Sequence, residues 1–161
     1  MTVEDRDHGY KDLLELVDDL KRRKMHVAVG VLDGSGEIPD EGISVAGLAT
    51  VHEFGAWAGK NRKVWVPERA PIRKTLDEAE NRINVAATRV LTKAARGDIS
   101  VEAALGTLGE FVTSQIRRTI QRGVEPPNAE STIARKKSSK PLIDTGLLLR
   151  SYTYQVREGE D

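Results

Sequence analysis

The sequence predicts an α+β fold in which two or three long helices pack on a small, mainly antiparallel sheet. Two long segments, residues 69–96 and 100–122, carry apolar residues at steps of three and four, which is the spacing of one helix face. Two short segments, residues 25–32 and 151–157, alternate apolar and polar residues as strands do. The chain has 161 residues and no internal repeat or linker, so we expect a single domain over residues 1–161.

The first two elements are a helix and a strand. Residues 10–23 have four apolar side chains at helical spacing, which predicts an amphipathic helix within an N-terminal region of residues 1–24. Residues 25–32 place four apolar side chains on one face of a strand. These apolar residues are Leu13, Leu14, Val17 and Leu20 in the helix, and Met25, Val27, Val29 and Val31 in the strand.

Turn residues divide the next part of the chain. Residues 33–42, DGSGEIPDEG, predict a long mobile loop. Ser44 can cap a short helix that ends at Gly55, because a serine oxygen accepts the free N–H groups of a first turn. Residues 56–63 predict a second loop with a basic tip, and residues 64–66 predict a short strand.

The two long helices follow. Residues 69–96 predict one helix of about 40 Å, at 1.5 Å per residue, closed by Gly97. Ser100 can cap the second helix, which ends at Gly123, and the short connection favours an antiparallel pair. The apolar stripes are Ile72, Leu76, Ala79, Ile83, Ala86, Val90 and Ala94 in the first helix, and Val101, Leu105, Leu108, Val112, Ile116 and Ile120 in the second.

The last part of the chain predicts short elements. Residues 129–137 predict one or two helical turns. Asp144 or Thr145 can then cap a short helix, GLLL. Residues 151–157 form a closing strand with both tyrosines and the valine on one side.

Composition limits the classes of function. The chain has 25 basic and 25 acidic residues, which argues against a general nucleic-acid binder. It has no cysteine, no signal or transit segment and no apolar run of membrane length, so we expect a cytoplasmic protein without thiol chemistry. Residues 1–20 hold seven acids against two bases, and residues 115–150 hold eight bases against three acids. These are either two solvated faces or surfaces that attract each other, within one chain or between copies.

Two motifs suggest catalysis, but neither is complete. Asp144, Thr145 and Gly146 spell the active-site triplet of an aspartic protease. That mechanism needs a second aspartate nearby and a long tract for the flap, and only 15 residues follow Gly146. His52 and Glu53 begin the HExxH zinc motif, but Ala56 stands where its second histidine belongs.

Two further motifs suggest phosphate binding. Residues 55–60, GAWAGK, are one residue short of a phosphate-binding loop and lack the Ser or Thr that follows its lysine. The run ARKKSSK at residues 134–140 could contact phosphates, but a solvated loop or a patch for an acidic protein is favoured. We therefore expect no catalytic centre, no metal site and no cofactor.

Three phrases, taken in order and with their spacing, resemble the tail-completion or head–tail joining proteins of tailed bacteriophages. The matching residues are Ala49, His52, Glu53, Phe54 and Gly55 in GLATVHEFG; Val66, Pro67 and Arg69 in VWVPERAP; and Pro141, Leu142, Asp144, Thr145, Gly146, Leu148 and Ser151 in KPLIDTGLLLRS. The resemblance covers a family core of residues 25–157. It departs from the family at residues 70–72, Ala-Pro-Ile, where the family tends to have Pro-Phe directly.

The resemblance implies a structural protein of the virion neck, assembled in the host cytoplasm. Such proteins form a ring, here of about six copies or of about twelve, that joins the head connector to the tail and leaves a channel for DNA. The implied partners are other copies, a head-completion or connector protein, a tail tube or tail terminator protein, and DNA passing without sequence-specific binding. No membrane is implied.

The helix that ends in HEFG and the loop after it are expected to contact the neighbouring neck ring. The candidate interface residues are His52, Glu53, Phe54, Trp57, Lys60, Arg62, Trp65, Arg69, Arg135, Lys136, Lys137 and Asp144. Trp57 and Trp65 are either interface anchors or ordinary core residues. The alternatives are a tail terminator or minor tail protein of the same virion, an aspartic protease, or a nucleic-acid-binding module that uses residues 117–140.

Overall fold

The computed structural model describes residues 10–38, 42–59, 61, 63–136, 141–143 and 146–159, and it has the expected α+β fold. The described elements, in chain order, are α1 (Tyr10–Arg23), β1 (His26–Val31), α2 (Val45–Phe54), β2 (Ala56–Ala58), β3 (Val64–Val66), α3 (Pro71–Ala95), α4 (Val101–Arg122), α5 (Glu130–Lys136), α6 (Leu147–Ser151) and β4 (Tyr152–Arg157).

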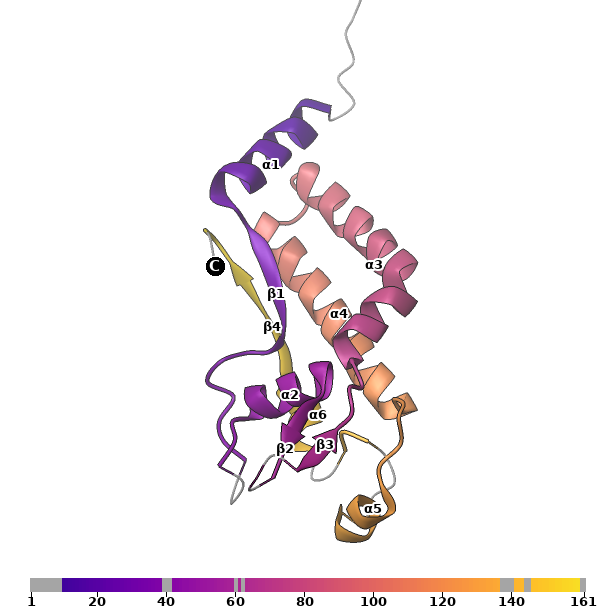
Figure 1. Ribbon diagram of the computed structural model, residues 1–161. Helices are drawn as coiled ribbons and strands as arrows, with labels where there is room; N and C mark the ends of the chain where they lie inside the picture. The colour runs from indigo at the N-terminus through magenta and orange to yellow at the C-terminus, as the bar shows by residue number, and fades with distance from the viewer. Residues whose placement is uncertain are drawn as a thin grey trace, which may run out of the picture.

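The long helices α3 and α4 run antiparallel, as the sequence predicted, and the strands β1 and β4 lie beside α4 (Figure 1). Helix α1 lies at one end of the molecule, near the connection between α3 and α4. Helices α2 and α6 and the strands β2 and β3 lie at the opposite end, and α5 extends beyond them. The molecule therefore has two ends that are built from different elements.

The strands form two sheets rather than the single sheet that the sequence predicted. Strands β1 and β4 pair antiparallel, with Val29 opposite Tyr154 and Val31 opposite Tyr152. Strand β3 pairs instead with β2, so the prediction of a loop over residues 56–63 was wrong at its start. The three residues Ala-Trp-Ala suit a strand because their tryptophan faces another tryptophan across the hairpin.

The core is built on α4, where four residues of the predicted apolar stripe are buried and the other two, Val101 and Leu108, are half-buried. Buried side chains of α4 meet residues from α2, α6 and β4 in one cluster. Its buried members are Val45, Ala49, Val112, Ile116, Ile120, Val124, Leu142, Leu148 and Tyr152. The predicted stripe of α3 is much less buried, since only Pro71, Thr75 and Ala79 of that helix are buried and Leu76 is exposed.

A close contact between β4 and α4 fixes the middle of the molecule. The ring of Tyr154 lies over Gly109 of α4, so close that an added Cβ there would stand 2.5 Å from Tyr154 Cδ2. At Gly106, one turn earlier, the same added atom would stand 3.8 Å from the ring. Gly109 is therefore required by packing, whereas Gly106 is not.

The two predicted serine caps are confirmed. Ser44 accepts a hydrogen bond from the backbone of α2 at 2.9 Å, and Ser100 accepts one from α4 at 3.1 Å. Helix α6 begins after Gly146, which stands in the left-handed conformation without a side-chain cap. Asp144 and Thr145, the expected caps, lie outside the described residues.

Candidate interaction surface

The start of α3 is capped by a residue from a different helix. Ala70, in the cap position, has φ of 45° and makes no side-chain cap hydrogen bond. Glu53 of α2 takes this role, because its carboxylate accepts from the backbone N–H of Ile72 at 3.0 Å and of Arg73 at 3.1 Å. Only 6% of Glu53 is exposed, so this bond between two helices is made away from water, where a negative charge suits the positive end of a helix dipole.

Arg69 binds a third segment, residues 126–128, near the start of α3. Its guanidinium donates to the carbonyl of Pro126 at 3.0 Å, to that of Pro127 at 3.3 Å and to Asn128 Oδ1 at 3.4 Å. Arg69 is 5% exposed, and burial lowers the pKa of its guanidinium. Its backbone N–H donates to the carbonyl of His52 at 2.8 Å. Together these contacts of Glu53 and Arg69 form what we call the buried node.

The buried node corrects two of the predicted interface residues. Glu53 and Arg69 are buried and bind within the chain, so their roles are structural. His52 is half-buried, and its Nδ1 lies 3.4 Å from Arg69 Nη1. The sequence held a signal for this, since a helix that begins Arg-Ala-Pro has no Ser, Thr, Asp or Asn to cap it. Such a helix needs an acceptor from elsewhere in the chain.

Three aromatic side chains lie exposed beside the buried node. Trp57 and Trp65 face each other across the β2–β3 hairpin, with ring centroids 5.3 Å apart in an edge-to-face arrangement. They are 59% and 51% exposed, and Phe54 at the end of α2 is 61% exposed. We call these three residues the hairpin patch. The guanidinium of Arg73 stands 5.0 Å above the Phe54 ring, which adds a cation–π contact.

Gly55 joins the buried node to the hairpin patch. Its φ of 72° is a conformation that residues with a Cβ rarely adopt. An added Cβ would also stand 3.0 Å from Trp65 Cζ2 and 3.0 Å from the backbone nitrogen of Glu68. The hairpin can therefore fold back closely on the end of α2 only because residue 55 is glycine.

The remaining predicted interface residues are not described in full. Arg135 and Lys136 lie in α5, but their side chains are outside what the structure describes. Lys60, Arg62, Lys137 and Asp144 lie outside the described residues altogether. Of the candidates whose side chains are described, Phe54, Trp57 and Trp65 are exposed, and the two tryptophans contact each other.

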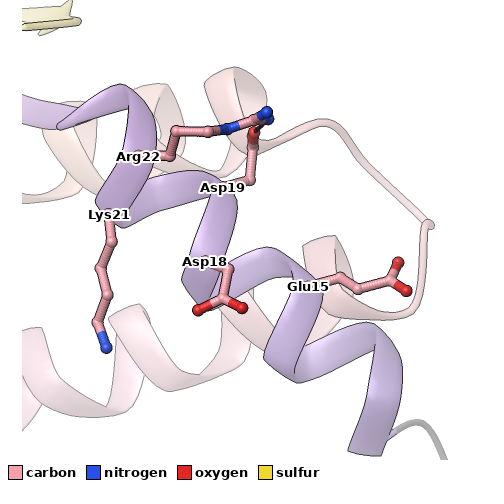
Figure 2. Close-up of a pocket in the computed structure, with 5 residues that line it drawn as sticks. All are labelled: Glu15, Asp18, Asp19, Lys21 and Arg22. Carbon is pink, nitrogen blue, oxygen red and sulfur yellow. Dashed lines mark hydrogen bonds and ion pairs between the residues drawn. The ribbon is translucent and has the colours of Figure 1, made fainter.

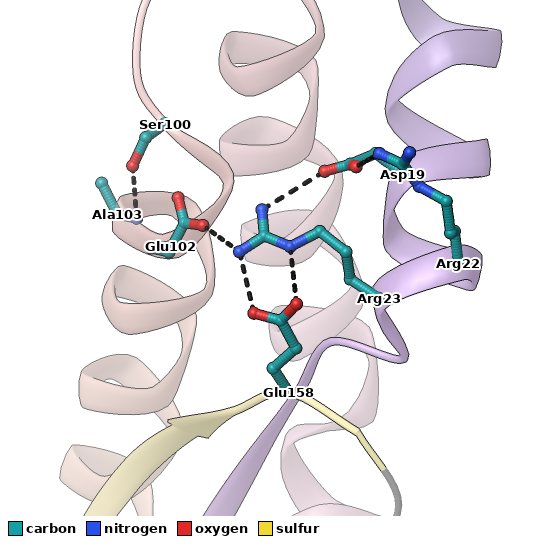
Figure 3. Close-up of polar contacts among 7 residues, drawn as sticks. All are labelled: Asp19, Arg22, Arg23, Ser100, Glu102, Ala103 and Glu158. Atoms are coloured by element: carbon teal, nitrogen blue, oxygen red, sulfur yellow. Dashed lines mark hydrogen bonds and ion pairs between the residues drawn. The ribbon is translucent and has the colours of Figure 1, made fainter.

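The opposite end of the molecule holds a polar cluster that the sequence did not reveal. Arg23 Nη2 donates to Glu102 at 2.8 Å and to Glu158 at 3.0 Å, and Arg23 Nη1 donates to Asp19 at 3.4 Å (Figure 3). Asp19 and Arg23 lie in α1, Glu102 lies at the start of α4, and Glu158 directly follows β4. Because they are separated by 79 and 135 positions in the sequence, no local pattern could have paired Arg23 with Glu102 and Glu158.

The charges in this cluster shift one another's pKa. Hydrogen bonds from Arg22 and then Arg23 lower the pKa of Asp19, and a hydrogen bond from Arg23 lowers that of Glu158. The pKa of Glu102 is lowered first by its own backbone N–H and then by Arg23. The pKa of Arg23 is raised, mainly by Glu158 and Glu102. We call Arg23 and its three carboxylates the arginine cluster.

A shallow depression lies on the surface of α1. It is lined by Glu15, Asp18, Asp19, Lys21 and Arg22, all from one helix (Figure 2). Arg22 turns toward Asp19 and binds it at 2.6 Å, whereas Lys21 points away from both. These side chains do not converge on a common point, so we assign no ligand to the depression.

The described residues also bear on metals and membranes. Within them, no three His, Asp or Glu side chains are grouped so that they could hold a metal ion. No helix in the described part of the chain is both long and apolar enough to cross a bilayer.

Comparisons with known proteins leave the family open. No protein-family model, no curated protein and no solved structure matches this chain.

Proposed function

We propose that this protein is a structural component of the neck of a tailed bacteriophage, where a ring of copies joins the head connector to the tail. The observation that carries the proposal is the hairpin patch. Three large aromatic side chains are more than half exposed in a chain whose aromatic residues make up only 4%. Exposed apolar groups of this kind mark sites of protein association, and tryptophan is enriched among residues that dominate binding.

The position of the resembling phrases supports the proposal. The first two phrases meet in the buried node, where Glu53 caps the helix that follows Arg69. The third phrase supplies Leu142 and Leu148, which are buried in the same core as Ala49 of the first phrase. Phrases that are far apart in the chain thus build one end of the molecule. A shared fold would conserve such an arrangement, because each phrase is needed to place the others.

The rigidity of the hairpin patch also supports an assembly role. Gly55 and the tryptophan pair fix the hairpin against α2, and α2 is fixed to α3 by Glu53. A surface that is already ordered loses little entropy when it binds, so the same contact can be repeated in every copy of a ring.

Genetic disruption and electron microscopy would test the proposed function. In the phage or prophage that encodes this chain, disrupting its gene should leave full heads and finished tails that do not join. Supplying the wild-type chain from a plasmid should restore joined particles. Supplying the variant with Trp57→Thr and Trp65→Thr should not, whereas Val85→Gln, which changes an exposed apolar residue of α3, should restore joining as the matched control.

Immunogold labelling would locate the protein. We expect label at the head–tail junction of joined particles. Label confined to free tails would assign the chain to the tail terminator instead. Joined particles at normal yield after disruption, together with no label on any particle, would refute both.

A further inference from the structure

Helix α1 leaves part of its apolar side exposed in the single chain. Leu13 and Leu14 are 43% and 45% exposed, and none of the 14 residues of α1 is buried. An isolated helix of this length is marginal in water, because most helices gain their stability by packing an apolar face. Arg23 holds the C-terminal end of α1 to the body of the molecule. Helix α1 also contacts α3, but Leu13 and Leu14 in its N-terminal half remain exposed.

The hairpin patch is the second exposed apolar surface, and it lies at the opposite end of the molecule from α1 (Figure 1). The two surfaces cannot touch within one copy. Trp57 and Trp65 offer broad rings of the kind that receive aliphatic side chains of an amphipathic helix. Both surfaces are apolar, so they can pair across two copies.

The charges around the two surfaces are complementary. Residues 10–20 of α1 hold four acids and one base, whereas residues 59–63 of the sequence, which join β2 to β3, hold three bases and no acid. Opposite charges favour this pairing and orient it. Two α1 helices packed on each other would bring acid against acid. The charge pattern therefore favours α1 on the hairpin patch over α1 on α1.

We propose that α1 of one copy docks on the hairpin patch of the next copy, with Leu13 and Leu14 against Trp57 and Trp65. The contact joins two different surfaces, so each copy keeps one of each kind for further neighbours. Repetition of such a contact closes a ring if the rotation between copies allows it, and otherwise extends a filament. The inference rests on the proposed function, for which it supplies the contact between copies, but its test uses the purified chain alone.

Sedimentation velocity with two defective variants tests the pairing. The wild-type chain should form species larger than a dimer as its concentration rises. Leu13→Gln with Leu14→Gln should remove one surface, and Trp57→Thr with Trp65→Thr should remove the other, so each variant alone should lose self-association and sediment as a monomer. An equal mixture of the two should form dimers and nothing larger, because only one intact contact can form per pair.

Val85→Gln should associate like the wild type, and raising the salt concentration should weaken association by screening the opposite charges. A wild-type chain that stays monomeric at every concentration would overturn the inference. So would a hairpin variant that still associates, or a mixture that stays monomeric while both variants keep the wild-type circular dichroism spectrum.

Cross-linking gives a second readout that does not depend on removing the tryptophans. The chain has no cysteine, so Lys11→Cys beside Leu14 and Asn61→Cys beside the hairpin would be its only thiols. With a short bismaleimide, the double variant should give a ladder of multimers, and either single variant should remain uncross-linked. Dimers from Lys11→Cys alone would show α1 packed on α1 and overturn the inference. The immunogold result above would be unaffected, so the two proposals can fail separately.

Discussion

Two arginines hold distant parts of this chain together, and they do so in opposite environments. Arg69 is buried and donates to neutral oxygens, two of them backbone carbonyls, in the buried node. Arg23 is more exposed and binds three carboxylates in the arginine cluster. Burial lowers the pKa of Arg69, whereas acidic partners raise that of Arg23.

The difference indicates how firmly each end of the molecule is built. Removing a partner in a buried site leaves polar groups without water, which costs much more than the bond itself contributes. An exposed ion pair exchanges its partner for water at little cost. We therefore expect the end with the hairpin patch to be rigid and the end with α1 to be readily released.

The largest effect should come from breaking the helix cap in the buried node. Glu53→Ala should lower the free energy of unfolding by about 2–4 kcal/mol, because two N–H groups of α3 lose their acceptor and a cavity remains. Chemical denaturation would measure this. Glu68→Ala is the matched control, since Glu68 is exposed and contacts the same Arg73 at 3.1 Å. Equal losses in the two variants would show that burial of the cap is not the cause.

Arg69→Lys would test the buried node while keeping its positive charge. A lysine ammonium cannot bind the carbonyls of Pro126 and Pro127 and the side chain of Asn128 together, as the planar guanidinium does. We therefore expect a loss of about 2 kcal/mol in the free energy of unfolding. The exposed Arg82→Lys on α3 should change stability little. A wild-type denaturation midpoint for Arg69→Lys would show that the carbonyls of Pro126 and Pro127 need no directed donor.

The contact of Gly109 with Tyr154, in the middle of the molecule, tests the contribution of packing without charge. Gly109→Ala should lower the free energy of unfolding by about 1–2 kcal/mol, because its Cβ would collide with Tyr154. Gly106→Ala should raise it by up to about 1 kcal/mol, since alanine favours a helix interior and the ring is far enough away. Thermal unfolding of the pair would check the opposite signs, and equal signs would contradict the described contact.

The smallest effect should be the pH dependence of the arginine cluster. The folded pKa values of Asp19, Glu102 and Glu158 are lowered, so their contribution to stability is present above the ordinary carboxyl pKa and is lost as pH falls through the folded values. The stability difference between the wild type and Arg23→Gln should therefore shrink below about pH 4. High salt at neutral pH should shrink it too. A difference that is constant from pH 6 to pH 3 would contradict the assigned partners.

The sequence by itself determined the elements of this protein. Apolar spacing predicted α1, α3 and α4, alternation predicted β1 and β4, and Ser44 and Ser100 marked two helix starts, because all of these depend on residues within a few positions of one another. It also singled out the three aromatic residues of the hairpin patch, although it left open whether the tryptophans were buried or exposed.

Only the tertiary structure decided what the polar residues do. Glu53 and Arg69 were predicted to contact a partner, and the fold instead buries them as a cap and a tie within the chain. The meeting of Arg23 with Glu102 and Glu158 was likewise absent from any local pattern. The physical reason is that burial and charge pairing depend on which distant segments meet in space. The local spacing of residues in the sequence does not specify those tertiary contacts.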